Sequence, residues 1–395
     1  MSAVSVARRH WPTAPPDGLL ACVLLAFLAS AGLFYVNVMP AIVSGLKDGL
    51  GFSNTQAGYV ASANIYGAAC GALTAVFLVG RVPWKPAEAA ALCLLLLFDL
   101  ASMFVTAPHA LIVLRAVHGF CGGISVGLGL AIMARTRVPD RAFGMLLTVQ
   151  FGAGALGLSM LPELAQRQGT WVLFAALAAF TLVTLAMLPF LAAYPPRPVS
   201  TLPQRVLGGG SQLPLLATLL ALFLFQGANM GLFAFIIPLG RHYGLGTPFI
   251  SETLGVSNVV AVLGSLFVIW SGARFGRRLP ILVAMSVSVL GTAVLLRSNI
   301  PALFVVANVG TGIMWSFMVP CLFAMCAEFD TAGRSVTLGG FCSKMGLASG
   351  PLAAPFVIGA EDYGRLVAAA VAILVLCALA ALGPATMIDG ERQTT

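Results

Sequence analysis

The sequence predicts an all-α membrane protein with twelve transmembrane helices in two pseudo-symmetric six-helix bundles. Its 395 residues are 59% hydrophobic and only 9% charged, whereas about a quarter of the residues of a soluble domain are charged. Apolar runs of about 20 residues, long enough to cross a bilayer, recur along the whole chain. A segment rich in Pro, Gly and Ser interrupts these runs near the middle and divides them into two sets of six.

Hydropathy windows of about 20 residues place the individual spans. The predicted spans are 19–43, 54–79, 86–106, 109–133, 142–164, 170–193, 213–239, 250–273, 279–297, 301–326, 335–358 and 364–386. The corresponding domains are an N-terminal segment 1–18, an N-terminal bundle 19–193, a linker 194–212, a C-terminal bundle 213–386 and a tail 387–395.

The two bundles are predicted to be repeats of each other. Three residues of the fifth span recur at a constant offset of 193 in the eleventh span, and the same offset relates Gly119 to Gly312. The three pairs are Arg141 and Arg334, Gly157 and Gly350, and Pro162 and Pro355. Repeated halves with a binding site between them are a common plan of transporters.

Lysine and arginine predict the orientation. With the N-terminus inside, 14 of the 21 cations lie in inner segments, 5 in outer segments, and Arg115 and Lys344 lie within spans. Cytoplasmic loops carry the excess of these residues. We therefore expect a multi-pass protein of the plasma (inner) membrane with both termini in the cytoplasm.

Several other classes of protein are not indicated. The cations form no basic stripe for nucleic acid, and the eight cysteines lie in apolar segments without a CxxC pair. Gly152, Gly154 and Gly157 spell G-x-G-x-x-G within a span, where glycines serve helix packing rather than dinucleotide binding. We predict no catalytic residues, metal or cofactor, and a monomer surrounded by lipid. Without a Walker motif, the energy would come from a gradient.

Two motifs show a family resemblance. The predicted inner loop between spans eight and nine reads ARFGRRLP, and span four contains Leu111, Arg115 and Gly119 in an L-x-x-x-R-x-x-x-G pattern. The chain therefore resembles the major facilitator superfamily over essentially its whole length, although Ala273 stands where an Asp is usual. The resemblance implies a secondary transporter with alternating access and a gating loop formed by Arg274, Gly276, Arg277 and Arg278.

Lys344 is the main candidate for substrate binding. It lies near the middle of the apolar stretch 335–358, which contains no acidic residue. An ionisable group at that depth usually faces a cavity or a partner. The alternatives are a neutral amine, a pair with Asp99 or Glu163, or an anion-binding charge in a hydrated cavity. We favour the anion-binding role.

Asp99 and Arg115 form the second candidate. Each lies eight residues from position 107 in the turn between spans three and four, so both lie at about the same depth, roughly 12 Å from the turn. Opposite charges at one depth in lipid should pair. The pair could be a permanent salt bridge, or protonation of Asp99 could free Arg115 and so couple a proton to the opening of the site. His118 shares the helix face of Arg115 and is either a proton relay or a packing residue.

Further polar residues lie within the spans and together fit a polar pocket, although each alone is more typical of an interhelical hydrogen bond. Asn308, Thr311 and Trp315 share one helix face, and Trp315 is expected to form a flat wall. Asn37 is expected near the entrance. The remaining residues predicted to bind substrate are Asn64, Gln150, Gln226, Asn229 and Asn258.

The leading prediction is a transporter of a small organic anion, such as a carboxylate, working by proton symport or exchange with a counter-anion. Arg115 and Lys344 would bind the anionic end. The alternative is a proton-coupled antiporter that exports hydrophobic drugs or metabolites, with Asp99 as the titrating group.

Overall fold

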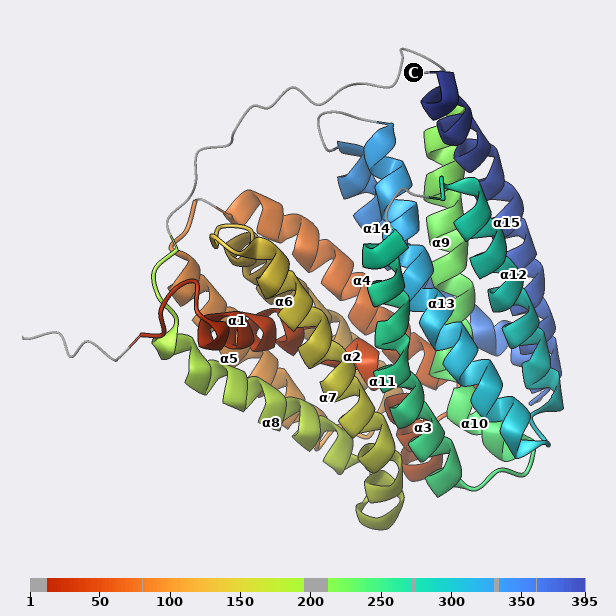
Figure 1. Cartoon of the computed structure of the whole chain (residues 1–395). Helices are drawn as coiled ribbons and strands as arrows, with labels where there is room; N and C mark the ends of the chain where they lie inside the picture. Colours follow the sequence, from red (N-terminus) through yellow and green to blue (C-terminus); the bar gives the residue numbers. More distant parts are fainter. Residues whose placement is uncertain are drawn as a thin grey trace, which may run out of the picture.

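The structure, a computed structural model, describes residues 13–79, 81–194, 212–271, 275–329, 334–359 and 361–394. These residues form a helical protein (Figure 1). Its helices are α1 (Leu19–Ala31), α2 (Phe34–Asn37), α3 (Met39–Leu50), α4 (Asn54–Leu78), α5 (Trp84–Ser102), α6 (Pro108–Met133), α7 (Pro139–Gln168), α8 (Trp171–Met187), α9 (Leu213–Ala234), α10 (Ile236–His242), α11 (Thr247–Ser271), α12 (Arg278–Val294), α13 (Pro301–Glu328), α14 (Arg334–Ile358) and α15 (Tyr363–Thr394), with short 3-10 helices η1 (Leu188–Phe190) and η2 (Leu295–Arg297).

Within the described ranges, ten helices are long and apolar enough to cross a membrane. Two predicted spans are not among these ten. Span one is divided into the shorter helices α1, α2 and α3, and α5 carries the three charged residues Lys85, Glu88 and Asp99. With these two added, a helical pass corresponds to each of the twelve predicted spans, so the predicted fold class is confirmed.

The first and seventh spans are not the continuous helices that the sequence predicted. The first is broken on either side of α2, and α3 restarts with Pro40 in its first turn. The seventh is broken at Phe235, and α10 has Pro238 in its first turn. Proline lacks an N–H and clashes with the carbonyl four residues earlier, so a continuous helix through these positions would be strained. The break leaves Asn37 at the end of α2.

Two helix ends follow local sequence signals. Ser53 and Gln56 form a reciprocal capping box at the start of α4, with bonds of 3.0 and 3.1 Å, because each side chain satisfies a backbone N–H that the helix leaves free. The last helix, α15, continues to Thr394 and so includes most of the segment predicted as a tail.

The helices fall into two groups, on the left and right of Figure 1. We call them the N-terminal helix group (α1–α8) and the C-terminal helix group (α9–α15). The predicted linker between them is residues 194–212, of which 195–211 lie outside the described residues. Contacts of α4 with α14 and of α7 with α11 join the groups. At Gly58 of α4, a side chain would overlap the carbonyl of Pro351, so the close approach of α4 and α14 requires glycine there.

Polar contacts between the groups gather toward the end that the sequence predicts to be outside. Lys47 donates to the Tyr363 hydroxyl at 2.8 Å and lies 3.8 Å from the Glu361 carboxylate. Arg241 pairs with Asp48. Gln166 contacts Thr247 at 2.9 Å at the same end, and Tyr66, at the middle of α4, contacts Ser349 at 2.8 Å. Among the described residues, no hydrogen bond or ion pair is found between the groups at the opposite end.

Candidate functional site

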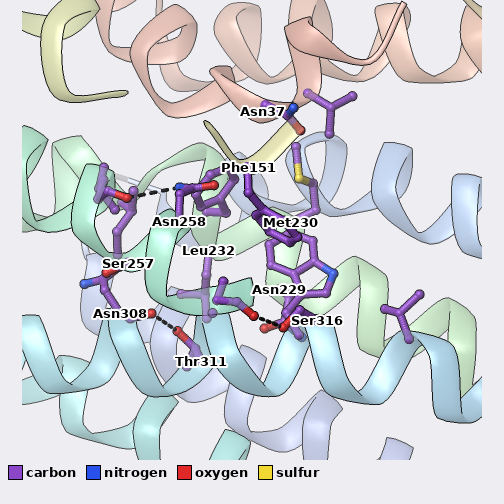
Figure 2. Close-up of a pocket in the computed structure, with 18 of the residues that line it drawn as sticks. Asn37, Phe151, Asn229, Met230, Leu232, Ser257, Asn258, Asn308, Thr311 and Ser316 are labelled. Atoms are coloured by element: carbon purple, nitrogen blue, oxygen red, sulfur yellow. Dashed lines mark hydrogen bonds between the residues drawn. The ribbon is translucent and has the colours of Figure 1, made fainter. Parts of the chain in front are cut away.

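A cavity of about 340 Å³ lies where α2, α7, α9, α11 and α13 meet. This volume is in the range of small-molecule sites. Figure 2 shows its lining, which contains both polar and apolar side chains. The N-terminal helix group contributes Val36, Asn37, Leu147, Gln150 and Phe151, and the C-terminal group contributes the rest: Gln226, Asn229, Met230, Leu232, Phe233, Ile236, Leu254, Ser257, Asn258, Ala261, Ser265, Thr292, Leu295, Asn308, Thr311, Gly312, Trp315, Ser316, Val319 and Pro320.

The lining contains six of the nine residues predicted to bind substrate and also Asn37, which was expected near the entrance. The six are Gln150, Gln226, Asn229, Asn258, Asn308 and Trp315. Every lining side chain in the described part of the chain is uncharged. The cavity can therefore recognise a ligand through hydrogen bonds and apolar contact. A charged group of the ligand would need a counterion outside this set of lining residues.

Trp315 forms one side of the cavity and is held by neighbours from two other helices. Its indole N–H donates to Gln226 Oε1 at 2.6 Å, and Gln226 Nε2 donates to the Ser343 hydroxyl at 2.7 Å. Phe233 packs edge-on against the indole with ring centroids 5.7 Å apart. Asn308 and Thr311 line the same cavity, as their helical spacing with Trp315 predicted. This chain of hydrogen bonds connects the cavity wall on α13 and α9 to α14.

Lys344 lies one residue beyond Ser343 on α14 and does not itself line the cavity. It shares a helix face with Pro351, which packs against α4 about two turns farther along. The lysine is partly buried, and in the described structure its ammonium makes no hydrogen bond or ion pair. Both acids proposed as partners are engaged elsewhere: Asp99 with Arg115 and Glu163 with Arg167.

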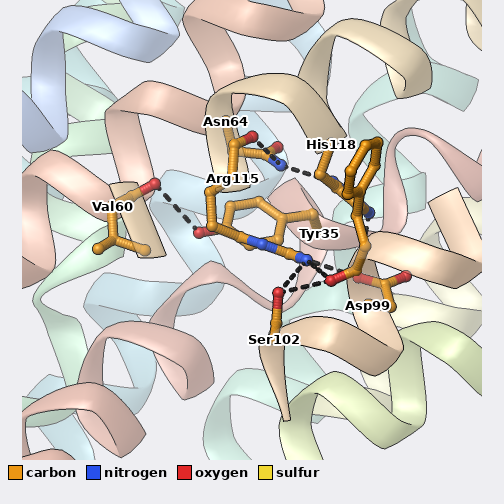
Figure 3. A network of polar contacts seen from close by, with 8 residues as sticks. Tyr35, Val60, Asn64, Asp99, Ser102, Arg115 and His118 are labelled. Carbon is orange, nitrogen blue, oxygen red and sulfur yellow. Dashed lines mark hydrogen bonds and ion pairs between the residues drawn. The ribbon is translucent and has the colours of Figure 1, made fainter. Parts of the chain in front are cut away.

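Asp99 and Arg115 form the ion pair that their equal depth predicted (Figure 3). Arg115 Nη1 donates to Asp99 Oδ1 at 2.9 Å, and its Nη2 donates to the Ser102 hydroxyl at 2.6 Å and to the Phe98 carbonyl at 3.0 Å. Arg115 is 0% and Asp99 1% exposed. Such enclosure allows a charge only when its partner and further hydrogen bonds compensate it.

His118 and Asn64 extend this ion pair into a network. His118 Nε2 lies 3.1 Å from Asp99 Oδ1, and its Nδ1 lies 2.8 Å from Asn64 Nδ2. Because the amide group donates there, Nδ1 accepts and Nε2 carries the proton that faces Asp99. Asn64 Nδ2 also donates to the Arg115 carbonyl at 3.2 Å. The imidazole thus links Asp99 to α4.

Arg115 and Asn64 therefore do not occupy the places that the sequence analysis expected. Both were predicted to contact substrate, yet neither lines the cavity, and both are buried within the N-terminal helix group. The sequence placed them at the correct depth in the membrane. It could not show that the Asp99–Arg115 pair is enclosed within the N-terminal helix group rather than facing the interface of the two groups.

Tyr35 connects the network to the cavity and was not singled out in the sequence. Its ring lies 5.8 Å from the Arg115 guanidinium, and its hydroxyl donates to the Val60 carbonyl at 3.4 Å. The next two residues of α2, Val36 and Asn37, line the cavity. The sequence contained one indication of this role. Tyr35 and the polar Asn37 lie shortly before Pro40, where a continuous helix is unfavourable.

The predicted gating loop is held by acids that the sequence analysis did not connect with it. Arg274 lies outside the described residues. Gly276 has φ 68°, and the Asp389 carboxylate of α15 accepts from the backbone N–H groups of Arg277 and Arg278 at 2.7 and 2.8 Å. Arg277 also pairs with Glu328 at 2.8 Å. Asp389 of α15 and Glu328 of α13 thus hold the described part of this loop.

Glu88 is a further buried acid that the sequence analysis overlooked. It lies in α5 with 0% exposure, accepts a hydrogen bond from the Ser125 hydroxyl, and has no partner for its Oε2 in the described structure. Its position within predicted span three was the available signal. It lies in the N-terminal helix group and does not line the cavity.

This fold and its central cavity agree with the family comparison. Residues 20–355 match the Major Facilitator Superfamily, and the chain belongs to that family. It is therefore a multi-pass membrane protein and a secondary transporter, and it is not an enzyme. No curated protein matches it in sequence.

Solved structures share its fold at low sequence identity. The nucleoside transporter NupG is 15% identical, with a TM-score of 0.72 over 93% of this chain and 99% of that one. The D-xylose-proton symporter is 14% identical, with a TM-score of 0.69 over 91% and 96%. A bacterial homologue of the human lysosomal transporter Spinster, in an inward-facing and unoccupied conformation, is 13% identical, with a TM-score of 0.70 over 95% and 98%.

Proposed function

We propose that this protein transports a small organic anion, such as a carboxylate, across the inner membrane, and that Lys344 binds the anionic group. The observation that carries the proposal is that the Lys344 ammonium makes no hydrogen bond or ion pair in the described structure, while the adjacent Ser343 is bonded to the cavity-lining Gln226. A cation at this depth is unfavourable without a partner, and a substrate carboxylate would supply one. Arg115 has its own counterion, so the proposal assigns it no direct contact with substrate.

The connection between Lys344 and the cavity passes through Ser343. Its hydroxyl holds Gln226, which lines the cavity and in turn holds Trp315. A ligand whose body lies against Trp315 would therefore have its end close to α14. The contacts between the helix groups gather at the predicted outer end, which favours a cavity reached from the cytoplasm in this conformation.

A neutral polar solute is the second candidate. The uncharged lining of the cavity favours it, and two proteins of the same fold are a nucleoside transporter and a D-xylose-proton symporter. In that case Lys344 would not contact the solute. The two candidates thus differ in whether binding depends on the charge at position 344.

The buried network is the candidate for proton coupling, alongside exchange with a counter-anion. Asp99 and His118 are ionisable groups in contact, and Tyr35 connects them to the cavity-lining end of α2. Protonation of Asp99 would weaken its attraction for Arg115 and so allow Tyr35 and Asn37 to move. Proton uptake at the network would then change the shape of the cavity, without a proton passing through the substrate site.

The Lys344→Gln variant tests the substrate assignment. Purified protein should be stabilised thermally by members of a panel of carboxylates, and the variant should lose this stabilisation while its own melting temperature is retained. Lys344→Arg should keep part of the response. Arg365→Gln, which removes an exposed cation at the predicted outer surface, is the matched control. Carboxylate binding that is unaltered in Lys344→Gln would refute the anion assignment.

The Asp99→Asn variant tests the coupling. Asparagine retains an oxygen that can accept from Arg115 but cannot carry the charge. We expect uptake into proteoliposomes to lose its dependence on an imposed pH gradient, while exchange of substrate across the membrane persists. A normal response to the gradient in this variant would show that the network is only structural.

A further inference from the structure

The asparagines of the cavity have a common orientation. Asn229, Asn258 and Asn308 each donate a hydrogen bond from Nδ2 to the carbonyl four residues earlier in the same helix, at 2.8, 3.0 and 2.8 Å. A carbonyl can only accept, so the NH₂ group must face it and the amide orientation is determined. Each side chain therefore uses one of its two Nδ2 N–H groups on its own helix, and its Oδ1 accepts no hydrogen bond in the described structure (Figure 2).

Other donors of the cavity are used in the same way. Asn37 Nδ2 donates to the Gln150 carbonyl at 3.2 Å. The hydroxyl groups of Ser257 and Thr311 donate to backbone carbonyls at 2.7 and 2.8 Å, and that of Ser316 donates to the carbonyl of Ile313 at 3.0 Å. The protons of these three hydroxyl groups are thus engaged, while their oxygens can still accept hydrogen bonds.

The cavity consequently offers amide oxygens that accept no hydrogen bond, together with the second N–H of each amide. In the described structure, no group donates to Oδ1 of Asn37, Asn229, Asn258 or Asn308. The Trp315 N–H, often a free donor, is engaged by Gln226. Among the lining residues, the Gln150 amide and the Thr292 hydroxyl also have no side-chain hydrogen bond in this part of the structure. A ligand that fills the cavity must therefore supply donors of its own, because polar groups buried without partners are unfavourable.

A carboxylate would not satisfy this lining. It only accepts hydrogen bonds, so inside the cavity it could take the remaining amide N–H groups but would leave the four asparagine Oδ1 atoms without a donor. An ammonium group would satisfy the acceptors but would be repelled by the nearby Lys344. Hydroxyl groups can donate to the amide oxygens without either penalty, and the carbon face between them can pack against the Trp315 indole and the Phe233 ring.

We infer that the substrate is a polyhydroxylated carboxylate of the sugar-acid type, with its hydroxyl groups in the asparagine-lined cavity and its carboxylate toward Lys344. The assignment of the carboxylate rests on the proposed function, whereas the assignment of the hydroxyl groups rests on the orientation of the asparagines. The two parts can therefore fail separately.

Three probes of similar length separate these outcomes: gluconate, hexanoate and sorbitol, titrated against the purified protein by calorimetry. We expect gluconate to bind more than about tenfold more tightly than hexanoate, because several hydroxyl hydrogen bonds are lost in hexanoate. Equal binding of hexanoate would overturn the hydroxyl assignment but leave the anion proposal. Equal binding of sorbitol, unaffected by Lys344→Gln, would overturn the anion proposal but leave the hydroxyl assignment. Failure of all three to bind would overturn the sugar-acid class.

Asn258→Leu tests the lining directly, since leucine has a similar size but no acceptor. It should weaken gluconate binding about three- to tenfold and leave hexanoate binding unchanged, and Asn308→Leu should behave alike as an independent variant. Thr218→Val is the matched control, because its hydroxyl bonds to Pro214 away from the cavity. An equal loss for both probes would indicate a merely structural role for the asparagines and would contradict the inference.

Discussion

The N-terminal helix group encloses Arg115 together with its counterion Asp99, whereas Lys344 of the C-terminal group makes no hydrogen bond or ion pair in the described structure. Arg115 is surrounded by Asp99, Ser102 and a backbone carbonyl. Lys344 has no such neighbour in the described structure. The N-terminal group also contributes only five of the cavity-lining residues. Under the proposed function, the N-terminal group holds this ion pair within itself, and the C-terminal group supplies most of the contacts to the ligand.

The largest effect expected from this difference is on stability. Arg115→Leu should destabilise the protein by about 3–5 kcal/mol, because Asp99 would remain as a buried charge without its partner. Lys344→Leu should cause no comparable loss, because it leaves no group unpaired. Unfolding of both variants in detergent would measure the contrast.

The double variant Arg115→Leu with Asp99→Leu provides the control. Since both charges are then removed together, most of the lost stability should return. A double variant that is no more stable than Arg115→Leu would show that packing around the guanidinium, rather than the ion pair, stabilises this region.

A smaller effect is expected at the junction of the groups. Gly58→Ala places a methyl group where the Pro351 carbonyl lies, so the closed arrangement of α4 and α14 should lose about 1–3 kcal/mol. A cysteine introduced at Thr311, in a protein lacking the exposed Cys70 and Cys93, should then react faster with an impermeant thiol reagent added from the predicted outer side. Gly144→Ala is the control, since no atom lies within 4 Å of its added carbon. Unchanged reactivity in Gly58→Ala would contradict the expected opening.

The smallest effect is expected at the predicted outer ion pair. Asp48 and Arg241 are partly exposed, with 42% and 24% of their side-chain surface accessible, and such pairs contribute about 0.2–1 kcal/mol. Asp48→Asn should therefore change the thiol reactivity of the same reporter by no more than about fivefold, and high salt should reduce the difference. The exchange of both charges, Asp48→Arg with Arg241→Asp, should restore the original rate.

The sequence by itself determined the twelve passes, the depth of the polar residues and the pairing of Asp99 with Arg115. These follow from hydropathy, helical rise and the unfavourable transfer of charge to lipid, which are local properties. Helical spacing likewise placed Asn308, Thr311 and Trp315 on one face.

Only the tertiary structure decided which buried groups meet a cavity. Depth is a single coordinate, and it does not say toward which neighbour a side chain turns. For this reason Arg115 and Asn64 were predicted at the substrate but belong to a closed network, and the breaks around α2 and at Phe235 were not foreseen. The tertiary structure also decided the orientation of the asparagine amides. Which end of each amide carries the NH₂ group is known only once its partner carbonyl and the cavity are placed.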